Sequence, residues 1–445
     1  MPISEKIFKA YDIRGLSEEI TPEVAIATAR VLVRKLQAKR IIVGRDARQT
    51  SPQLLQAAVR GIQAEGATAI VIGECSTSVF NYAVTKAGLA DGGLMVTASH
   101  NPAAYNGLKC SDSTGLPLSG QDLMAEVIAL SAEPLPVELA GGLEEHDVLD
   151  DYVAACLAGQ PIAAFQGLKV AVDYGNGMGA RAFQAVAAAL GLELHELYET
   201  PDPNFPNHEA NPAKRETLAD LTALVLRVGA CCGIAFDGDA DRVGFVDERG
   251  QPYRGDHILG LLAVGVLKDQ PGAKIIIQPN HSWATLDAIQ AHGGQMIMKP
   301  VGRTHVIRGM HAEGAVLGGE VADHFFFAEF AGLEAVDFAA VEVLKKIALT
   351  HQPLSALLAP YSQYHSSWDL NFHVDQPADI VARLASIYIP QATTVSQLDG
   401  LRCDFARDWW FIVRPSSTEP ILRLTIEAKS ADLLALKMAE LQAHL

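Results

Sequence analysis

One pattern recurs three times along the chain: an apolar strand, a turn, an amphipathic helix, a glycine and a second apolar strand. The first copy spans residues 40–72, the second spans residues 168–197 and the third spans residues 274–298. β-Branched residues are frequent in the strands, and a glycine that ends each helix is ordinary punctuation of α/β structure. The repetition predicts three related α/β domains with mixed sheets.

The last part of the chain follows a different pattern. Two strand-like runs, residues 409–413 and 421–427, are followed by a helix-like run that starts near Ser430. We therefore expect an α/β fold in which three related α/β domains precede a C-terminal α+β domain. The predicted domains cover residues 1–149, 150–249, 250–364 and 365–445.

Composition and charge exclude several classes of protein. The 445 residues are 49% hydrophobic and carry a formal net charge of −17, which argues against a nucleic-acid or membrane-surface partner because both require a basic surface. No signal peptide or apolar run long enough to span a bilayer stands out, so we expect a cytoplasmic location. Six cysteines without a CxxC pair indicate reduced thiols rather than a zinc site or disulfide framework.

The first chemical segment covers residues 93–102 (GLMVTASHNP), where an apolar strand runs into a turn of small residues. This places Ser99 at the end of a strand, the edge at which α/β sheets bind ligands. The G-x-S-x-G spacing of an esterase nucleophile is missing. Taken alone, a serine in such a turn more often serves the turn itself.

The second segment, residues 233–242 (GIAFDGDADR), carries Asp237, Asp239 and Asp241 at alternate positions. Such crowding of negative charge requires a cation, and oxygen ligands beside a phosphate favour magnesium. An EF-hand loop needs glycine where Arg242 stands, and a haloacid-dehalogenase loop needs threonine or valine where Asp241 stands. The pattern therefore favours a metal site, and Arg242 suggests an anionic group on that metal.

Two later loops carry polar groups suited to a sugar phosphate. Residues 318–324 (GGEVADH) offer Glu320 and His324 to sugar hydroxyls, although this loop alone is better explained as solvated surface. Residues 414–420 (RPSSTEP) combine a guanidinium with three hydroxyls, which suits a phosphate. The candidate phosphate-binding residues there are Arg414, Ser416, Ser417 and Thr418, with Arg423 nearby.

These four segments, in this order, resemble the α-D-phosphohexomutase superfamily, and in particular its bacterial phosphomannomutase/phosphoglucomutase branch. The resemblance covers essentially the whole chain; the serine loop TASHNP and metal loop DGDADR are its specific motifs, and residues 11–14 (YDIR) and 105–109 (YNGLK) also match. It implies four domains around a central cleft. It also implies an isomerase that moves a phosphoryl group between the 1- and 6-positions of mannose or glucose, in the supply of nucleotide-sugar precursors.

The resemblance further implies a role for each candidate residue. Ser99 would carry the phosphoryl group and, with the three aspartates, hold one Mg²⁺, while hexose 1,6-bisphosphate would be intermediate and activator. Arg14 and Lys109 would assist proton transfer, and Arg242 would neutralise charge on the transferring group. The implied substrate-binding residues are Tyr11, His100, Arg303, His305, Glu320, His324, Arg414, Ser416, Ser417, Thr418 and Arg423. The expected partner is a phosphorylated hexose, and the expected state a monomer or homodimer.

Several positions depart from the family pattern. Ala322 and Asp323 change the sugar loop, Ser417 stands where asparagine is usual, and Arg303 stands where histidine is frequent. These changes leave the choice between mannose and glucose open. The alternative functions are a mutase for a hexosamine phosphate and a non-catalytic sugar-phosphate-binding homologue, and the retained Ser99 and aspartates argue against the latter.

Overall fold

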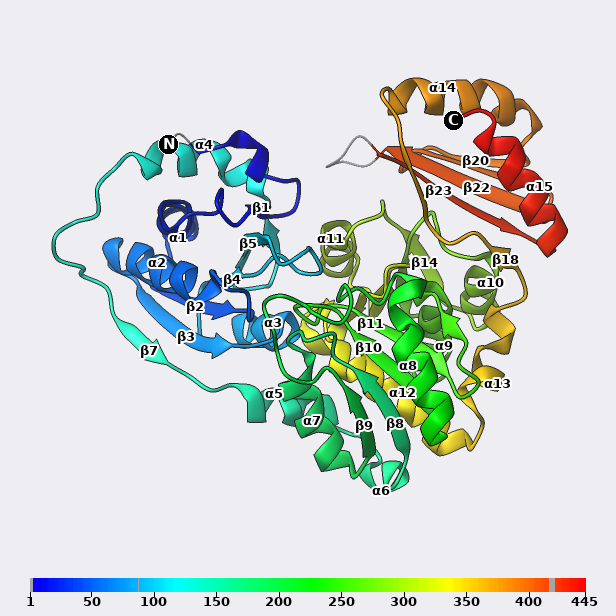
Figure 1. Ribbon diagram of the computed structural model, residues 1–445, viewed down its shortest axis with the longest axis horizontal. Coiled ribbons are helices and arrows are strands. Elements are labelled where there is room, and N and C mark those ends of the chain that lie inside the picture. Colours follow the sequence, from blue (N-terminus) through cyan, green and yellow to red (C-terminus); the bar gives the residue numbers. More distant parts are fainter. Residues whose placement is uncertain (1–2, 87, 416–420) are drawn as a thin grey trace. The chain divides into compact units, whose positions relative to one another are not determined.

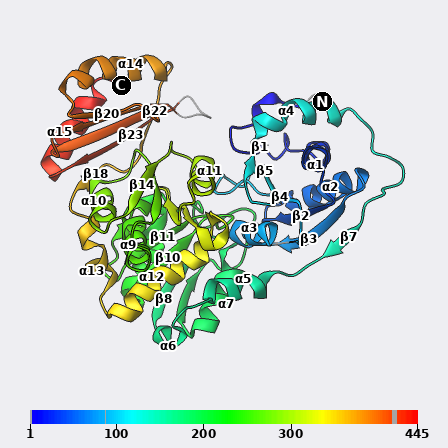
Figure 2. The same cartoon turned by 180° about the vertical axis from the view of Figure 1, so that it is seen from behind.

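The computed structural model describes residues 3–86, 88–415 and 421–445. The chain forms two compact units: unit 1 joins Met1–Tyr253 to Ala322–Leu354, and unit 2 joins Arg254–Val321 to Ser355–Leu445. Figures 1 and 2 show the elements of both units from two opposite sides. No helix among the described residues has the length and apolar composition needed to cross a membrane.

Unit 1 begins with a mixed sheet in the order β1-β5-β4-β2-β3-β7, with β6 paired to β5. Its strands are β1 (Ile13–Leu16), β2 (Arg40–Arg45), β3 (Thr68–Glu74), β4 (Gly92–Val96), β5 (Tyr105–Asp112), β6 (Pro117–Leu118) and β7 (Leu143–Glu145). The accompanying helices are α1 (Pro22–Leu36), α2 (Ser51–Ala64), α3 (Thr77–Thr85) and α4 (Gly120–Ser131).

Alternation along β2 explains how this sheet is covered on both faces. Ile41 and Val43 point into a core shared with α1, α2 and α4. Gly44 points to the opposite face, where a Cβ would lie 3.3 Å from the ring of Phe80 in α3. The helices therefore bury both faces of the sheet. This packing fixes the end of β2 and the end of β4, and the serine loop begins at the end of β4.

The second sheet of unit 1 has the order β12-β11-β10-β8-β9 and is again mixed. Its strands are β8 (Lys169–Asp173), β9 (Glu193–Leu197), β10 (Cys232–Phe236), β11 (Val243–Asp247) and β12 (Pro252–Tyr253). Its helices are α5 (Leu149–Leu157), α6 (Ile162–Phe165), α7 (Gly179–Leu190) and α8 (Ala219–Val228). The chain later returns to unit 1 as β16 (Phe325–Phe327), β17 (Leu333–Glu334) and α12 (Val336–Thr350).

Unit 2 contains three parallel strands, in the order β14-β13-β15, and an antiparallel tail sheet. The first set is α9 (Gly255–Asp269), β13 (Lys274–Ile277), α10 (Trp283–Ala291), β14 (Gln295–Met298), α11 (Arg303–Glu313) and β15 (Leu317–Gly319). The tail, after α13 (Leu354–Leu358), consists of β18 (His365–Ser366), β19 (Leu370–His373), α14 (Pro377–Tyr388), β20 (Thr394–Ser396), β21 (Leu401–Phe405), β22 (Trp409–Pro415), β23 (Ile421–Ala428) and α15 (Ala431–Gln442).

The tail sheet is buried on both faces. One face packs on α14 and α15, whose Leu384 and Leu441 share a core with Phe411 of β22. The other face presents Trp410 and Ile412, which form a separate apolar cluster with Trp283 of α10. The tail is therefore packed against the preceding α/β elements of unit 2 through its strands.

The predicted fold class is confirmed, since each of the three repeats forms the expected strand, helix and strand. In the first repeat these are β2, α2 and β3. Gly314 ends α11 in a left-handed conformation (φ 63°), and β15 begins at Leu317. The four predicted domain limits stay predictions.

Candidate active site

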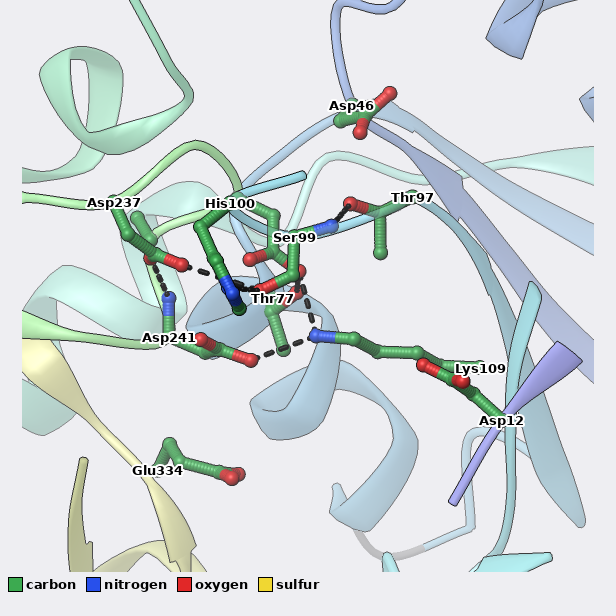
Figure 3. A network of polar contacts seen from close by, with 12 residues as sticks. Asp12, Asp46, Thr77, Thr97, Ser99, His100, Lys109, Asp237, Asp241 and Glu334 are labelled. Atoms are coloured by element: carbon green, nitrogen blue, oxygen red, sulfur yellow. Dashed lines mark hydrogen bonds and ion pairs between the residues drawn. The ribbon is translucent and has the colours of Figure 1, made fainter. Parts of the chain in front are cut away.

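The serine loop leaves the buried strand β4 in unit 1 and turns sharply at Ser99. Thr97 stabilises the turn, because its Oγ1 accepts a hydrogen bond of 2.9 Å from the backbone N–H of Ser99. Ser99 has a left-handed backbone (φ 53°) and is 4% exposed. Its Oγ lies 3.2 Å from Asp237 Oδ2 and 3.2 Å from His100 Nδ1 (Figure 3).

The metal loop connects β10 to β11 and is closed by its own first aspartate. Asp237 Oδ1 accepts hydrogen bonds from the backbone N–H groups of Asp241, at 2.9 Å, and Arg242, at 3.1 Å. Gly238 is required beside the serine loop, because a Cβ there would lie 2.7 Å from the carbonyl oxygen of Ser99. The two loops thus meet through their backbones, and the predicted pairing of Ser99 with Asp237 is present.

Lys109 of β5 reaches the same loop and lies between its other two carboxylates. Its Nζ donates to Asp239 Oδ2 at 2.6 Å and to Asp241 Oδ2 at 2.7 Å (Figure 3). Thr77 Oγ1, at the start of α3, donates to the same Asp239 oxygen at 2.6 Å. One ammonium therefore faces two of three buried carboxylates, which leaves negative charge in excess.

The donor set fits a hard divalent cation. Asp237, Asp239 and Asp241 are buried, and one oxygen of each lies within 4.8 Å of the others. Asp239 Oδ1 is buried and has no hydrogen-bond partner among the described residues. Burial, together with the charges of Asp241 and Asp239, raises the pKa of Asp237 well above its usual value. A cation at this position would relieve that repulsion, and three carboxylate oxygens are ligands that Mg²⁺ accepts.

Arg242 and His324 complete the unit 1 part of the site. His324 Nε2 lies 3.2 Å from Asp241 Oδ1 and 3.4 Å from Arg242 Nε, and Arg242 also donates to Asn211 Oδ1 at 3.2 Å. His100 follows Ser99 and is kept neutral, because burial and then the positive charge of Arg242 lower its pKa well below the usual value.

Arg14 reaches the serine loop from β1. Its guanidinium donates to Asn101 Oδ1 at 2.9 Å and forms an ion pair with Asp12. Tyr11 immediately precedes this strand and is partly buried. The structure therefore brings together, within unit 1, the predicted residues Ser99, Arg14, Lys109, Arg242, His100, His324, Asp237, Asp239 and Asp241.

Five further predicted residues lie in unit 2: Arg303, His305, Glu320, Arg414 and Arg423. Glu320 follows β15, and its Oε1 accepts hydrogen bonds from Gly302 N–H at 2.9 Å and Gln278 Nε2 at 2.7 Å. Gly302 has φ 126° and immediately precedes α11, so Arg303 and His305 stand in the first turn of that helix. The hydrogen bond from Gly302 ties the start of α11 to the predicted sugar loop.

Arg414 and Arg423 are cross-strand partners in the tail sheet. Side chains of directly opposed residues share one face of a sheet, where two like charges are unfavourable without a counter-charge. Asp399 supplies part of it: its Oδ2 lies 3.9 Å from Arg414 NH1 and accepts the N–H of Val301 at 3.1 Å. Two guanidinium groups at strand ends suit an anion. Ser416, Ser417 and Thr418 lie outside the described residues.

The structure accounts for one of the residues at which the sugar loop departs from the family pattern. Asp323 is buried and adopts φ 69°, a conformation that aspartate tolerates better than most residues. Its backbone oxygen accepts the N–H of Val243 at 3.0 Å, which joins this loop to the first residue of β11. Nothing in the structure explains Ala322.

Several contributing residues escaped the sequence reasoning because nothing in their local sequence marks them. Thr77 begins a helix, Asn211 lies in a loop, and Asp399 lies before β21. Only tertiary contacts bring them to the site. Asn101 could have been predicted, since it belongs to the serine motif itself.

Comparisons with known proteins agree with this geometry. The chain matches the phosphoglucomutase/phosphomannomutase family in all four of its parts: α/β/α domain I over residues 5–133, domain II over 150–250, domain III over 254–364 and the C-terminal domain over 370–443. It is 35% identical over 433 residues to the phosphomannomutase of Escherichia coli K12, covering 95% of this chain and 94% of that protein.

Two further relatives extend the comparison. A phosphohexose mutase of Xanthomonas campestris is 33% identical over 433 residues, covering 95% of both chains. The crystal structure of a phosphoglucomutase/phosphomannomutase family protein from Burkholderia thailandensis superposes with a TM-score of 0.90 at 32% identity, covering 100% of this chain and 97% of that one. The chain belongs to the α-D-phosphohexomutase superfamily.

Proposed function

We propose that the chain interconverts hexose 1-phosphates and hexose 6-phosphates, with mannose and glucose phosphates as substrates. The observation that carries the proposal is the position of Ser99 Oγ, 3.2 Å from Asp237 in a buried loop of three aspartates. Lys109 and Arg242 lie beside the same loop. Relatives at 33–36% identity that are named phosphomannomutase support mannose phosphate as the first substrate to test.

The proposed reaction has two phosphoryl transfers and consumes nothing else. In the first, a hexose phosphate hydroxyl attacks phosphoserine 99; the Oγ–P bond breaks, a sugar O–P bond forms, and the hydroxyl proton passes to Ser99 Oγ. The product, hexose 1,6-bisphosphate, then reverses its orientation within the site. In the second, Ser99 Oγ attacks the other phosphate, its proton passes to the sugar oxygen that is released, and phosphoserine forms again.

Each residue role follows from its place. We assign Lys109 and Arg14 to proton transfer at the sugar and serine oxygens, and Arg242 to neutralising the transferring group. Asp237, Asp239, Asp241 and phosphoserine would hold Mg²⁺, which when bound supplies Lewis-acid stabilisation of the phosphoryl oxygens. Added hexose 1,6-bisphosphate acts as activator, because it can phosphorylate any Ser99 that has lost its phosphate.

Unit 2 would hold the end of the substrate that is not reacting. Glu320 is fixed by two hydrogen bonds and would contact the sugar hydroxyls. Arg414 and Arg423 share one sheet face and would bind the second phosphate.

The test is a coupled assay with mannose 1-phosphate and glucose 1-phosphate, in the presence of Mg²⁺ and a trace of hexose 1,6-bisphosphate. Ser99→Ala should abolish turnover of both sugars. Ser111→Ala is the matched control, because Ser111 is also buried but lies in β5 away from the metal loop. Turnover that persists in folded Ser99→Ala would contradict the proposal, and so would binding of both sugar phosphates without turnover.

A further inference from the structure

Arg48 is a buried cation next to the serine loop for which the proposed reaction has no role. It lies between β2 and α2, and its side chain is 1% exposed. Its Nε donates to Asp46 Oδ2 at 3.1 Å, while Asp46 Oδ1 accepts from Arg48 N–H at 3.0 Å and from Ser51 Oγ at 2.6 Å. Asp46 therefore fixes the direction in which the guanidinium points.

The other four N–H groups of this guanidinium donate to four backbone carbonyl oxygens, three in the serine loop and one at the start of β5. NH2 donates to the oxygens of Ser99, at 2.8 Å, and Asn101, at 2.5 Å. NH1 donates to those of Pro102, at 2.8 Å, and Tyr105, at 3.0 Å. A guanidinium offers five N–H donors in a rigid plane, and all five have acceptors here. Lysine, with three donors at one point, cannot reproduce this pattern.

The carbonyl of Ser99 is the contact that matters most for chemistry. Ser99 adopts φ 53°, and a residue other than glycine in that region is held there by its surroundings at a cost in free energy. Arg48 binds the Ser99 carbonyl from one side, and the close approach of Gly238 limits its movement on another. The direction of Ser99 Oγ depends on this backbone conformation.

We propose that Arg48 is a positioning residue, which holds the Ser99 backbone in its left-handed conformation so that Oγ faces the metal loop. The inference rests on the proposed function. Arg48 bonds to the backbone of the loop and to Asp46, and none of its contacts is to Ser99 Oγ. Its removal should therefore slow phosphoryl transfer while leaving substrate binding in unit 2 intact.

The experiment compares Arg48→Lys and Arg48→Met with Arg30→Met. Arg30 is the matched control, because its side chain is 6% exposed, lies in the same sheet-and-helix layer and bonds to Glu65 and Glu133 away from the site. Because a misplacement of about 1 Å can cost 10²-fold in rate, we expect Arg48→Lys to lower kcat by about 10- to 100-fold with KM changed less than about threefold. Arg30→Met should lower the melting temperature and leave kcat within about twofold.

A second readout separates positioning from general loss of structure. Arg48→Ala leaves a space for guanidinium ion, so millimolar guanidinium should raise its kcat at least about fivefold, while urea at the same concentration and the Arg30→Met variant should show no gain. The ³¹P NMR signal of phosphoserine 99 should also broaden or shift in Arg48→Lys. A folded Arg48→Met with wild-type kcat, or an Arg48→Lys whose kcat loss equals that of Arg30→Met, would overturn the inference.

The two proposals fail in different ways. If Ser99→Ala retains full turnover, the proposed function is wrong, whatever Arg48 does. If Ser99→Ala is inactive and Arg48→Lys keeps the wild-type kcat, the function stands and only the role of Arg48 is wrong. Should Arg48→Met fail to fold, Arg48→Lys and the guanidinium rescue of Arg48→Ala still decide the question.

Discussion

Two places in unit 1 that bury carboxyl groups, the metal loop and Asp337, have surroundings that differ in kind. Asp239 and Asp241 of the metal loop share one ammonium, that of Lys109, and belong to a cluster of three acids. Asp337, in the first turn of α12, stands without another acid: its Oδ2 accepts from Tyr152 OH at 2.8 Å, and its Oδ1 has no hydrogen-bond partner among the described residues.

The difference shows that a buried aspartate can have two different roles. Burial raises the pKa of Asp337 to about 7, although hydrogen bonds from Tyr152 and the backbone lower it, so this carboxyl is neutralised by a proton below pH 7. Several carboxylates converging on one point instead provide ligands for a divalent cation, and Lys109 offsets only part of their charge. We therefore expect the metal loop to serve catalysis at a cost in stability, and Asp337 to affect stability alone.

The largest expected difference is in activity. Asp239→Asn should lower kcat on the order of 10²- to 10³-fold and weaken Mg²⁺ binding, because it removes a carboxylate whose buried Oδ1 has no hydrogen-bond partner among the described residues. Asp337→Asn should leave kcat within about threefold. Steady-state kinetics and calorimetric titration with Mg²⁺ test both. Equal losses of kcat in the two variants would remove the distinction between the sites.

Lys109→Met probes the charge balance of the metal loop. It leaves two buried carboxylates without their ammonium, so we expect a loss of about 3–5 kcal/mol in unfolding free energy without Mg²⁺. Mg²⁺ should restore part of that loss, since it can replace the missing positive charge. Urea denaturation with and without Mg²⁺ measures both quantities. A stability loss that Mg²⁺ does not change would count against a metal at this loop.

The pH dependence of stability should carry the signature of Asp337. Its folded pKa, about 7, exceeds the ordinary value of 3.8, so the folded state retains a proton that the unfolded state loses. This contribution is fully present below pH 4 and is lost as the pH rises to 7, with a slope of at most about 1.4 kcal/mol per pH unit. Asp337→Asn should flatten the profile between pH 5 and 7. An unchanged slope in that variant would assign the pH dependence to other groups.

The smallest effect is expected from Tyr152→Phe. It removes the hydroxyl that donates to Asp337, a bond that favours the ionised form. The loss of stability should be about 1.5–3 kcal/mol at pH 8, where the carboxylate is charged, and about 1 kcal/mol at pH 5. Thermal melts of Tyr152→Phe and wild type at the two pH values give the comparison. A larger loss at pH 5 than at pH 8 would contradict this account.

The sequence could predict the features that depend on residues close together in the chain. The aspartates of the metal loop stand at alternate positions, and Ser99 stands in a motif of six residues, so short stretches contained most of the chemistry. The α/β repeats were equally visible, because each strand and helix is apolar with its own period.

What the sequence could not predict depends on contacts between distant segments. Thr77 and Asp239 are 162 positions apart, and Arg48 and Ser99 are 51 apart. Arg45, Asp46 and Arg48 follow a buried strand, and such charged residues after a strand were a signal that could have been used. Cytoplasmic location and a monomeric or homodimeric state stay predictions.

The apolar cluster of Trp283, Trp410 and Ile412 has a consequence for anyone who divides the chain. A fragment that begins after Tyr364 would keep the helices on one face of the tail sheet and lose the cover on the other. Its exposed indole and isoleucine side chains would favour self-association, so the isolated fragment should precipitate at concentrations at which the whole chain remains dissolved.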